Sequence, residues 1–154
     1  MVTIARADRV ERDELLEFVR PRHRYTLVTH RQDGRLQVSP VSGGVDEQGR
    51  LVVSTYPDRA KAVNLRRDPS ATVLVHSDEW NDPYVQVDGT AEVLDMPEAE
   101  DALVDYFRCI AGEHPNWDDY RAAMRRQGKS LIRITIEEWG PVASGGFPPD
   151  RAPA

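Results

Sequence analysis

The residues best suited to binding chemistry lie in segment 54–67, STYPDRAKAVNLRR, which reads as the end of a strand followed by a short helix. Asp58 is predicted to cap this helix, so Arg59 and Lys61 fall in its first turn, where the helix dipole disfavours cations. A bound anion would reverse the sign, because free backbone N–H groups and both cations would then act together. The segment therefore indicates an anion site. The alternative is that Asp58 alone satisfies the helix end and that both cations are solvated.

Composition favours a specific role for Lys61. Of the 20 cationic residues, only Lys61 and Lys129 are lysines, so arginine is the default cation of this chain. A lysine at the junction suggests a compact point charge, as at some phosphate sites, in place of a planar guanidinium. Arg66 and Arg67 fall in the last turn, where cations are favourable and need no ligand to explain them.

Other kinds of catalytic chemistry lack their sequence signals. The chain has no dinucleotide, P-loop, nucleophile-elbow or zinc-protease motif, and its four histidines show no ligand spacing, so no metal site is expected. The single cysteine, Cys109, lies beside the apolar stripe of a predicted helix and is expected to be a buried, inert thiol. No acid, base or nucleophile is assigned.

Length and charge set broad limits. A chain of 154 residues is expected to form one domain over residues 1–154, with no intramolecular disulfide because it has one cysteine. Short apolar runs and a charged N-terminus argue against a membrane span and a signal peptide, and cysteine usage fits a reducing cytoplasm. A net charge of −6 argues against a nucleic-acid-binding protein.

The charge is unevenly divided along the chain. Residues 20–67 hold ten basic and four acidic side chains, whereas residues 78–119 hold thirteen acidic side chains and one basic side chain. This division suggests an anionic ligand on the first segment, or a subunit surface that pairs the two segments. Charge scattered over solvated faces would give the same counts.

Hydrophobic periodicity predicts an α+β fold. Alternation predicts strands at 25–29, 35–45, 51–56, 71–75, 84–94 and 131–136, with a hairpin turn at Asp33-Gly34. Helices are predicted at 7–19, at 58–67, from Pro97 to about residue 110, and around 117–124. Pro40 marks an edge, bulge or kink in its strand, and residues 147–154 are expected to be loosely ordered. Six such strands are most simply closed, or nearly closed, into a mainly antiparallel barrel with flanking helices.

Several segments together resemble one known superfamily. The run STYPDRAKAVNLRRDPSATVLV follows DGRLQVSPV and DEQGRLVVS and precedes YVQVDGTAEV and IAGEHPNWDDYR. Their order and spacing over roughly residues 10–142 resemble the pyridoxamine 5'-phosphate oxidase-like split-barrel flavoproteins. Within that superfamily the chain is similar to the actinobacterial branch that uses the deazaflavin coenzyme F420.

The resemblance implies a six-stranded split barrel that forms a homodimer, with two cofactor sites at the subunit interface. Arg59 and Lys61 would contact the cofactor phosphate, and Ser54 and Thr55 would donate hydrogen bonds from the end of their strand. Asn64 would lie one turn further along the helix. The strand formed by Val38, Ser39, Pro40 and Val41 would run past the tricyclic ring and offer main-chain hydrogen bonds.

The resemblance also implies a function. Flavin-mononucleotide (FMN) oxidases of the superfamily usually carry an arginine near the positions of Val38 and Ser39, and this chain has none there, which argues against FMN and against pyridoxamine phosphate oxidation. The expected activity is an F420-dependent reductase that transfers a hydride to a small unsaturated or aromatic acceptor. The alternatives are an FMN-dependent reductase or oxidase, and a non-catalytic module that binds F420, flavin or haem.

Overall fold

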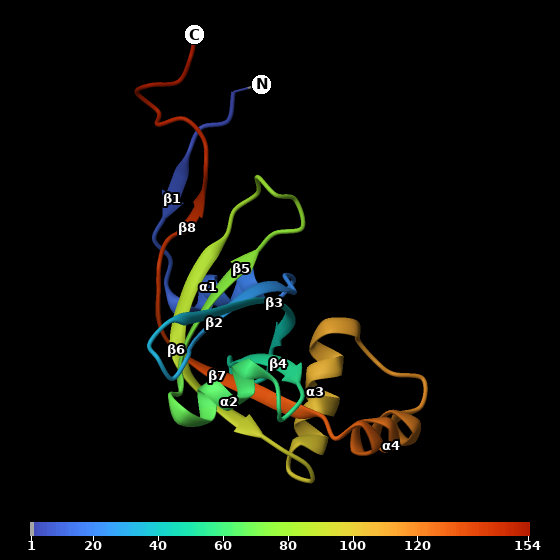
Figure 1. Cartoon of the computed structure of the whole chain (residues 1–154). Coiled ribbons are helices and arrows are strands. Elements are labelled where there is room, and N and C mark those ends of the chain that lie inside the picture. Colours follow the sequence, from blue (N-terminus) through green and yellow to red (C-terminus); the bar gives the residue numbers. More distant parts are fainter. Residues whose placement is uncertain (1) are drawn as a thin grey trace.

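The computed structural model describes residues 2–154 and contains a six-stranded barrel (Figure 1). Alternating apolar side chains fill the inside of this barrel. The barrel strands are β2 (Arg24–His30), β3 (Leu36–Val45), β4 (Leu51–Thr55), β5 (Ser70–His76), β6 (Val85–Leu94) and β7 (Ser130–Trp139). They close in the order β2-β3-β4-β7-β6-β5, and every neighbouring pair is antiparallel. The predicted α+β split barrel is therefore confirmed.

The barrel interior explains the period-two pattern. Leu27, Val53, Val73 and Val87 have no exposed surface, and each comes from a different strand. Burying one such side chain contributes about 1.5–3 kcal/mol relative to leaving it exposed. A slip of one residue in any strand would turn these side chains outward, so the apolar pattern fixes the register.

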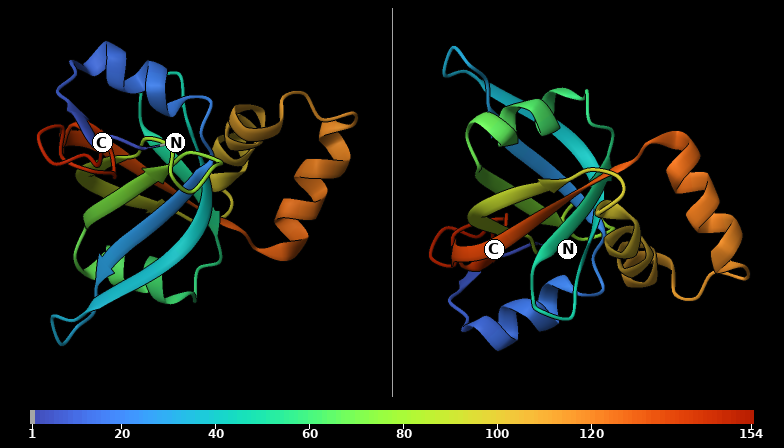
Figure 2. Two further views of the ribbon diagram at one scale, coloured as in Figure 1. Left: turned by 90° about the horizontal axis from the view of Figure 1, so that it is seen from above. Right: turned by 90° about the horizontal axis from the view of Figure 1, so that it is seen from below.

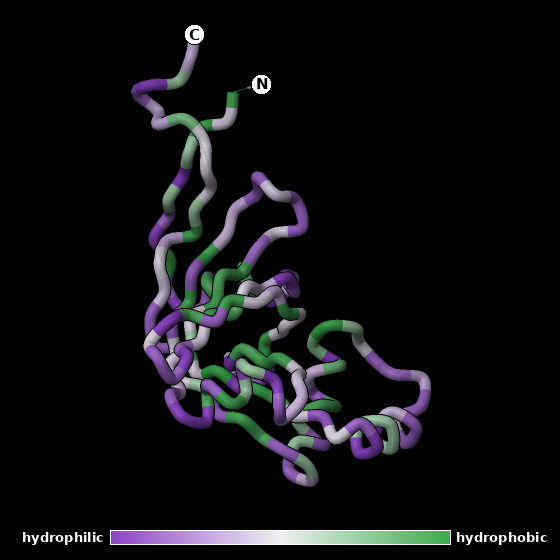
Figure 3. Tube along the Cα trace, viewed as in Figure 1, coloured by the Kyte–Doolittle hydropathy of each residue, from purple (hydrophilic) through white to green (hydrophobic). Residues whose placement is uncertain are grey.

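Four helices surround the barrel (Figure 2). They are α1 (Arg12–Val19), α2 (Ala60–Arg67), α3 (Ala99–Ala111) and α4 (Trp117–Gln127). α2 connects β4 to β5 and packs against β2 and β6, whereas α3 packs against β3, β4 and β7. The largely hydrophilic α4 (Figure 3) rests on α3, where the Tyr120 hydroxyl donates a hydrogen bond to the Leu103 carbonyl at 2.8 Å. None of these helices combines the length and apolar character needed to cross a membrane.

The two ends of the chain form a ribbon that the sequence did not predict. β1 (Arg6–Asp8) pairs with β8 (Val142–Ser144) and extends away from the barrel (Figure 1). The helix predicted over 7–19 is therefore wrong in its first part and begins at Arg12. The local pattern could not show this, because each of these short strands depends on a partner at the other end of the chain.

Two other predicted helix starts are also wrong. Asp58 does not cap α2, because a turn closes from the Arg59 N–H to the Tyr56 carbonyl at 3.2 Å and makes Arg59 the N-cap. Pro97 lies in the turn before α3, which begins at Ala99. In both cases the chain makes one more turn before the helix starts.

β3 is paired differently along its two halves, which gives the barrel its split. Residues 36–42 pair with β2 alone among the described strands, whereas residues 43–45 pair with β4. Pro40 lies in the half that pairs with β2 and not with β4, which agrees with the predicted edge position. Glycine is needed where the halves meet, because a Cβ at Gly43 would lie 2.1 Å from the Tyr25 ring and one at Gly44 would lie 2.7 Å from Cys109.

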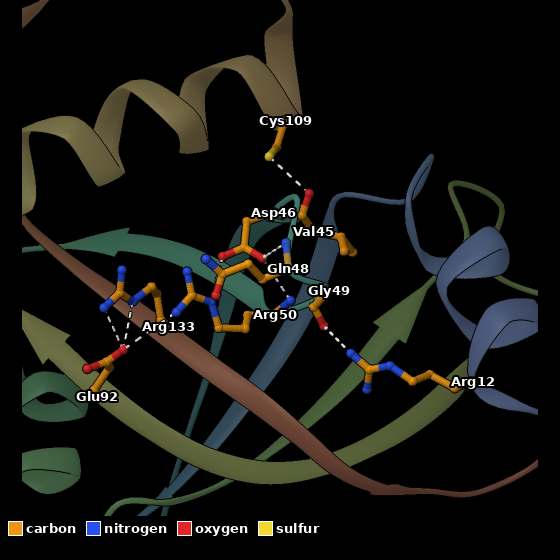
Figure 4. A network of polar contacts seen from close by, with 9 residues as sticks. All are labelled: Arg12, Val45, Asp46, Gln48, Gly49, Arg50, Glu92, Cys109 and Arg133. Carbon is orange, nitrogen blue, oxygen red and sulfur yellow. Dashed lines mark hydrogen bonds and ion pairs between the residues drawn. The ribbon is translucent and has the colours of Figure 1, made fainter.

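A polar network holds the turn between β3 and β4 (Figure 4). The buried Asp46 carboxylate accepts hydrogen bonds from the backbone N–H groups of Gln48 and Arg50 at 3.0 and 2.9 Å, and from Arg50 Nε at 2.8 Å. Glu92 accepts from Arg133 Nε at 2.8 Å on the neighbouring strands. The start of β4 is thereby fixed relative to the barrel.

The same turn is tied to two helices (Figure 4). Arg12 of α1 donates to the Gly49 carbonyl at 3.5 Å, and the half-buried Cys109 thiol of α3 donates to the Val45 carbonyl at 3.0 Å. Burial raises the pKa of the Cys109 thiol, so the thiolate is disfavoured. The predicted burial is therefore only partial, whereas the raised pKa agrees with the prediction of an inert thiol.

Candidate cofactor site

The connection from β4 to α2 is held in one conformation by Arg66. Its guanidinium donates to the Pro57 carbonyl at 2.8 Å and to Asp95 Oδ1 at 2.7 Å. Ser130, at the start of β7, also donates to Asp95 Oδ1. Arg66 therefore has a structural role, as its position in the last helical turn predicted. It holds in place the connection that carries Arg59 and leads to Lys61 in the first turn of α2.

The start of α2 differs from the starts of the other three helices. α1, α3 and α4 each carry two acidic residues in the first turn, whereas α2 carries none. The N-cap of α2 is Arg59, which is extended and makes no side-chain cap hydrogen bond. Lys61 follows as the second helical residue. The first turn of α2 thus holds a cation and no acidic side chain at the positive end of the helix dipole, an arrangement that favours a bound anion.

The two cations have no acidic partner in the part of the chain that the structure describes. No carboxylate among residues 2–154 forms an ion pair with Arg59 or Lys61. Burial lowers the pKa of the half-buried Lys61, and the nearby positive charge of Arg59 lowers it further. A bound phosphate would oppose both effects, because it would favour the charged ammonium.

Thr55, the last residue of β4, has a hydroxyl without a partner. The residue is 4% exposed, and its Oγ1 makes no hydrogen bond. Leaving a buried polar group unsatisfied costs about 1–3 kcal/mol. Thr55 directly precedes the connection that carries Arg59. The arrangement therefore fits an anion that would accept a hydrogen bond from the Thr55 hydroxyl. Ser54, its predicted companion, is half-buried.

Asn64 lies one turn further along α2, as predicted, but its side chain is committed within the protein. The buried amide donates from Nδ2 to Thr29 Oγ1 at 3.1 Å, and Oδ1 accepts from Arg67 at 3.1 Å. Arg67 also donates to the His30 carbonyl at 2.6 Å. These bonds hold α2 against the end of β2, and a direct contact from Asn64 to a cofactor stays a prediction.

The segment of β3 predicted to pass the cofactor ring lies in the half of the strand that pairs only with β2. Val38 and Pro40 are exposed, whereas Ser39 and Val41 are half-buried. Val38 is 54% exposed, a large value for a valine in a barrel strand. The backbone groups on the unpaired side of this segment are available to a ligand.

Tyr56 and Lys129 lie at the corner formed by the end of β4 and the start of α2. Neither residue was among the site residues predicted from the sequence. Lys129 directly precedes Ser130, and Ser130 pairs with Thr55, so Lys129 lies across from Tyr56. The Lys129 ammonium is 4.7 Å from the centroid of the Tyr56 ring, and Arg59 Cζ is 5.7 Å from it. The sequence held one signal for assigning Lys129 to the site: the chain has only two lysines, Lys61 and Lys129, and both lie near this corner.

A large cavity of about 850 Å³ lies at the other end of the unpaired segment. Pro40 and Val41 line one side, and the connection between β5 and β6 lines the other with Trp80 and Tyr84. The Trp80 side chain is 90% exposed. Asp78, Glu79 and Asp82 add negative charge to the rim, and the hydrogen-bonded pair of Thr26 Oγ1 and His76 Nε2, 2.8 Å apart, also lines the cavity.

Comparison with known proteins places the chain in a known group. The sequence pattern of a family described as pyridoxamine 5'-phosphate oxidase matches residues 12–143. The structure of conserved hypothetical protein Rv2991 from Mycobacterium tuberculosis is similar at 26% identity and a TM-score of 0.70, covering 89% of this chain and 88% of that one.

Two further solved structures share the fold. A structure described as an F420 reductase is 20% identical with a TM-score of 0.59, covering 80% of this chain and 94% of that one. A haem-binding protein from Mycobacterium smegmatis is 19% identical with a TM-score of 0.63, covering 94% of this chain and 57% of that one.

The unpartnered hydroxyl gives a stability test of the site. Thr55→Val should leave the unliganded protein as stable or up to about 1 kcal/mol more stable in urea unfolding, because an unsatisfied buried hydroxyl is replaced by a methyl group. Thr29→Val is the matched control. It should destabilise the protein by about 1 kcal/mol or more, because it leaves the Asn64 amide without its acceptor. If Thr55→Val destabilises the protein as much as the control does, the Thr55 hydroxyl forms a hydrogen bond within the unliganded protein and is not free to bind a ligand.

Proposed function

Because the chain belongs to the pyridoxamine 5'-phosphate oxidase family, we propose that it is an F420-dependent reductase that transfers a hydride from the reduced coenzyme to a small unsaturated or aromatic acceptor. The observation that carries the proposal is the start of α2, where Arg59 and Lys61 have no acidic partner among the described residues and Thr55 Oγ1 has no hydrogen-bond partner. These groups suit the phosphate of a bound cofactor.

Each of the three groups would have a distinct part in holding the phosphate. The Lys61 ammonium supplies a compact charge, and the Arg59 guanidinium supplies several N–H donors. The Thr55 hydroxyl would donate a hydrogen bond to a phosphate oxygen. The free backbone N–H groups in the first turn of α2, at the positive end of the helix dipole, would also attract the phosphate. An anionic ligand at this point replaces a repulsive arrangement with charge-assisted hydrogen bonds.

The deazaflavin, when bound, supplies the hydride at its C5 position. The protein residues hold and surround it. The unpaired edge of β3 at Val38–Val41 would offer backbone groups to the ring. The exposed side chains of Val38 and Pro40 would pack against the apolar face of the ring. We assign no general acid, base or nucleophile, because this chemistry needs the cofactor, an acceptor and the exclusion of water.

The choice of F420 over FMN rests on charge. FMN ends at one phosphate monoester, whereas F420 continues through a phosphodiester into a tail of several carboxylates. The absence of an arginine near Val38 and Ser39 also argues against FMN. The same fold in a structure described as an F420 reductase agrees with this choice, and an FMN enzyme or a haem-binding module remains a defined outcome of the test below.

The 850 Å³ cavity is the proposed acceptor site. It begins at Pro40 and Val41, which the proposed ring position also uses, and its far wall carries Trp80 and Tyr84. Aromatic walls suit a flat acceptor, and the polar pair of Thr26 and His76 can orient it. The loop of residues 77–83 is fixed by Ser77, which accepts a hydrogen bond from Arg22 at 2.9 Å.

A homodimer would complete this arrangement. Leu36 and Val38 expose their side chains on the outer face of β3, and Val63 exposes its side chain on α2. Both elements pack against β2, and exposed apolar side chains on elements that share a neighbour favour a protein interface. A second copy of the chain seated on this face would also shield the cofactor ring from water.

Removal of one cation tests the proposed function. The apo-protein should bind F420 more tightly than FMN in fluorescence titrations, and Lys61→Ala should weaken F420 binding by about 1–3 kcal/mol, because one charge-assisted hydrogen bond is lost. Lys61→Arg is the control: it keeps the charge but not the compact ammonium, and it should lose less affinity than Lys61→Ala. Equal affinity for F420 and FMN, an indifferent Lys61→Ala, or preferential binding of haem would contradict the proposal.

The lowered pKa of Lys61 predicts how binding depends on pH. The phosphate binds the charged ammonium, so the complex takes up a proton and affinity should fall as pH rises through the pKa of Lys61. Titrations between about pH 7 and pH 10 measure this fall. Lys61→Arg should show a flatter profile, because arginine stays charged. The same profile in both proteins would show that Lys61 does not face the phosphate.

The homodimer is tested by mass. The chain has a mass of 17.4 kDa, and sedimentation velocity of the purified protein should give twice this mass. A Val38→Asp variant should shift the protein toward the monomer, because a carboxylate would be buried in the interface. Gln127→Asp, at the end of α4, is the control. A wild-type monomer at micromolar concentration would exclude this interface.

A further inference from the structure

The loop between β5 and β6 holds aromatic side chains beside the 850 Å³ cavity. Ser77 accepts a hydrogen bond from Arg22 Nε at 2.9 Å and donates one to the Pro83 carbonyl at 2.5 Å, so the base of the loop is closed. Trp80, between these two points, is nevertheless 90% exposed, and Tyr84 at the end of the loop is 40% exposed. The loop therefore presents two aromatic surfaces to a ligand from a fixed base.

The wall across the cavity from this loop is a row of side chains on one face of the sheet. Pro40 on β3, Thr26 on β2 and Leu74 on β5 are register partners, so they are aligned across three neighbouring strands. All three residues line the cavity. A flat ring fits against such a row on one side and against the aromatic side chains of the loop on the other.

The charges around the cavity are mainly negative. Asp78, Glu79 and Asp82 line it, and Arg24 is the one lysine or arginine among the described residues that do so. Arg24 Nε lies 3.6 Å from Asp78 Oδ1, so these two charges offset each other. Glu79 and Asp82 therefore give the cavity its net negative charge. A cavity of one sign with low-dielectric walls concentrates ligands of the opposite sign.

This sign is opposite to that of the start of α2, where Arg59 and Lys61 lie. An anionic acceptor would be attracted to the proposed phosphate site and repelled by the cavity, whereas a cationic acceptor would be directed to the cavity. Trp80 adds to this preference, because the face of an indole ring attracts cations. Charge and aromatic surface at the cavity therefore favour the same class of ligand.

We propose that the cavity binds flat aromatic cations and that the acceptor of the reductase belongs to the iminium or N-alkylpyridinium class. The ring lies between Trp80 and the row of side chains on β3, β2 and β5, and Glu79 and Asp82 select its positive charge. The acceptor role rests on the proposed function, whereas the binding preference rests on the cavity alone.

A positively charged acceptor would need no proton donor from the protein. When a hydride adds to the carbon of a C=N⁺ group, one C–H bond forms and the C=N electron pair moves to the nitrogen. The acceptor is thereby reduced to a neutral amine. The two electrons come from the reduced coenzyme, whose remaining ring proton passes to water. Because the product has lost its charge, the acidic cavity holds it less tightly than the acceptor, which favours product release.

The test compares three probes that share one ring system and differ in charge. N-methylacridinium, acridine and acridine-9-carboxylate are cationic, neutral and anionic at about pH 8, and their dissociation constants are measured by calorimetry on cofactor-free protein. The cation should bind roughly 5- to 30-fold more tightly than the anion, with acridine between them, because two partly exposed carboxylates each contribute a few-fold. Added salt should narrow this difference.

Variants of the loop separate charge from stacking. The double substitution Glu79→Gln and Asp82→Asn should reduce the preference for the cation to less than about threefold and change acridine binding less than about twofold. Trp80→Ala should weaken binding of the cation and of acridine by roughly 3- to 10-fold, because the stacking surface is lost. Thermal melting of each variant establishes that it is folded.

A control removes the same amount of charge elsewhere. Glu47→Gln combined with Glu98→Gln neutralises two exposed carboxylates outside the cavity and should change the preference less than about twofold. Equal binding of the three probes, tightest binding of the anion, or a preference that persists without Glu79 and Asp82 would overturn the proposed cation site.

Reduction of the bound cation distinguishes this inference from the proposed function. With reduced F420, the wild-type protein should convert N-methylacridinium to the neutral dihydroacridine faster than the free coenzyme does. Binding without reduction would contradict the acceptor role and leave the cation site in place. Failure of the protein to bind F420 would contradict the proposed function, whereas the probe titrations, made without coenzyme, would still decide the preference of the cavity.

Discussion

The proposed binding site depends on the positive charge at the start of α2. The helix dipole, Arg59 and Lys61 all contribute the same sign there, and no carboxylate among residues 2–154 forms an ion pair with either side chain. The protein has a net charge of −6, but this corner lies in segment 20–67, where ten basic side chains outnumber four acidic ones. Folding must hold these like charges together, and an anion removes the repulsion. An anion that binds between Arg59 and Lys61 should therefore also stabilise the folded protein, because it removes the repulsion between these two side chains.

The rest of the fold keeps this corner in place. Arg66 and Asp95 fasten the connection before α2, and the bonds from Asn64 to Thr29 and from Arg67 to His30 fasten the helix to the barrel. At the other end of β4, the network around Asp46 fixes the turn. Rigid support of this kind is what a binding site needs, because the cations can then keep their positions before the ligand arrives.

Much of the fold could be predicted from the sequence because the determining patterns are local. Alternating apolar residues predicted all six barrel strands, and Pro40 predicted an edge in the half of β3 that pairs only with β2. β1 and β8 were missed because they pair across the whole length of the chain. The predicted Asp58 cap failed because one extra turn moved the helix start to Ala60.

The candidate site shows the same division. Arg59 and Lys61 could be found from charge and helix polarity alone, whereas the unpartnered Thr55 hydroxyl required knowledge of burial. Lys129 reaches the site through the pairing of β4 with β7, which sequence spacing does not reveal. The cavity near Trp80 depends on loop side chains, whose positions follow no periodic pattern.

The most direct measurement is a crystal structure of the protein with bound deazaflavin coenzyme. The account predicts phosphate oxygens within hydrogen-bonding distance of the Lys61 ammonium, the Arg59 guanidinium and the Thr55 hydroxyl, with the ring along Val38–Val41. A coenzyme bound with its phosphate elsewhere, and with Lys61 directed into solvent, would contradict the central claim that this corner exists to bind an anion.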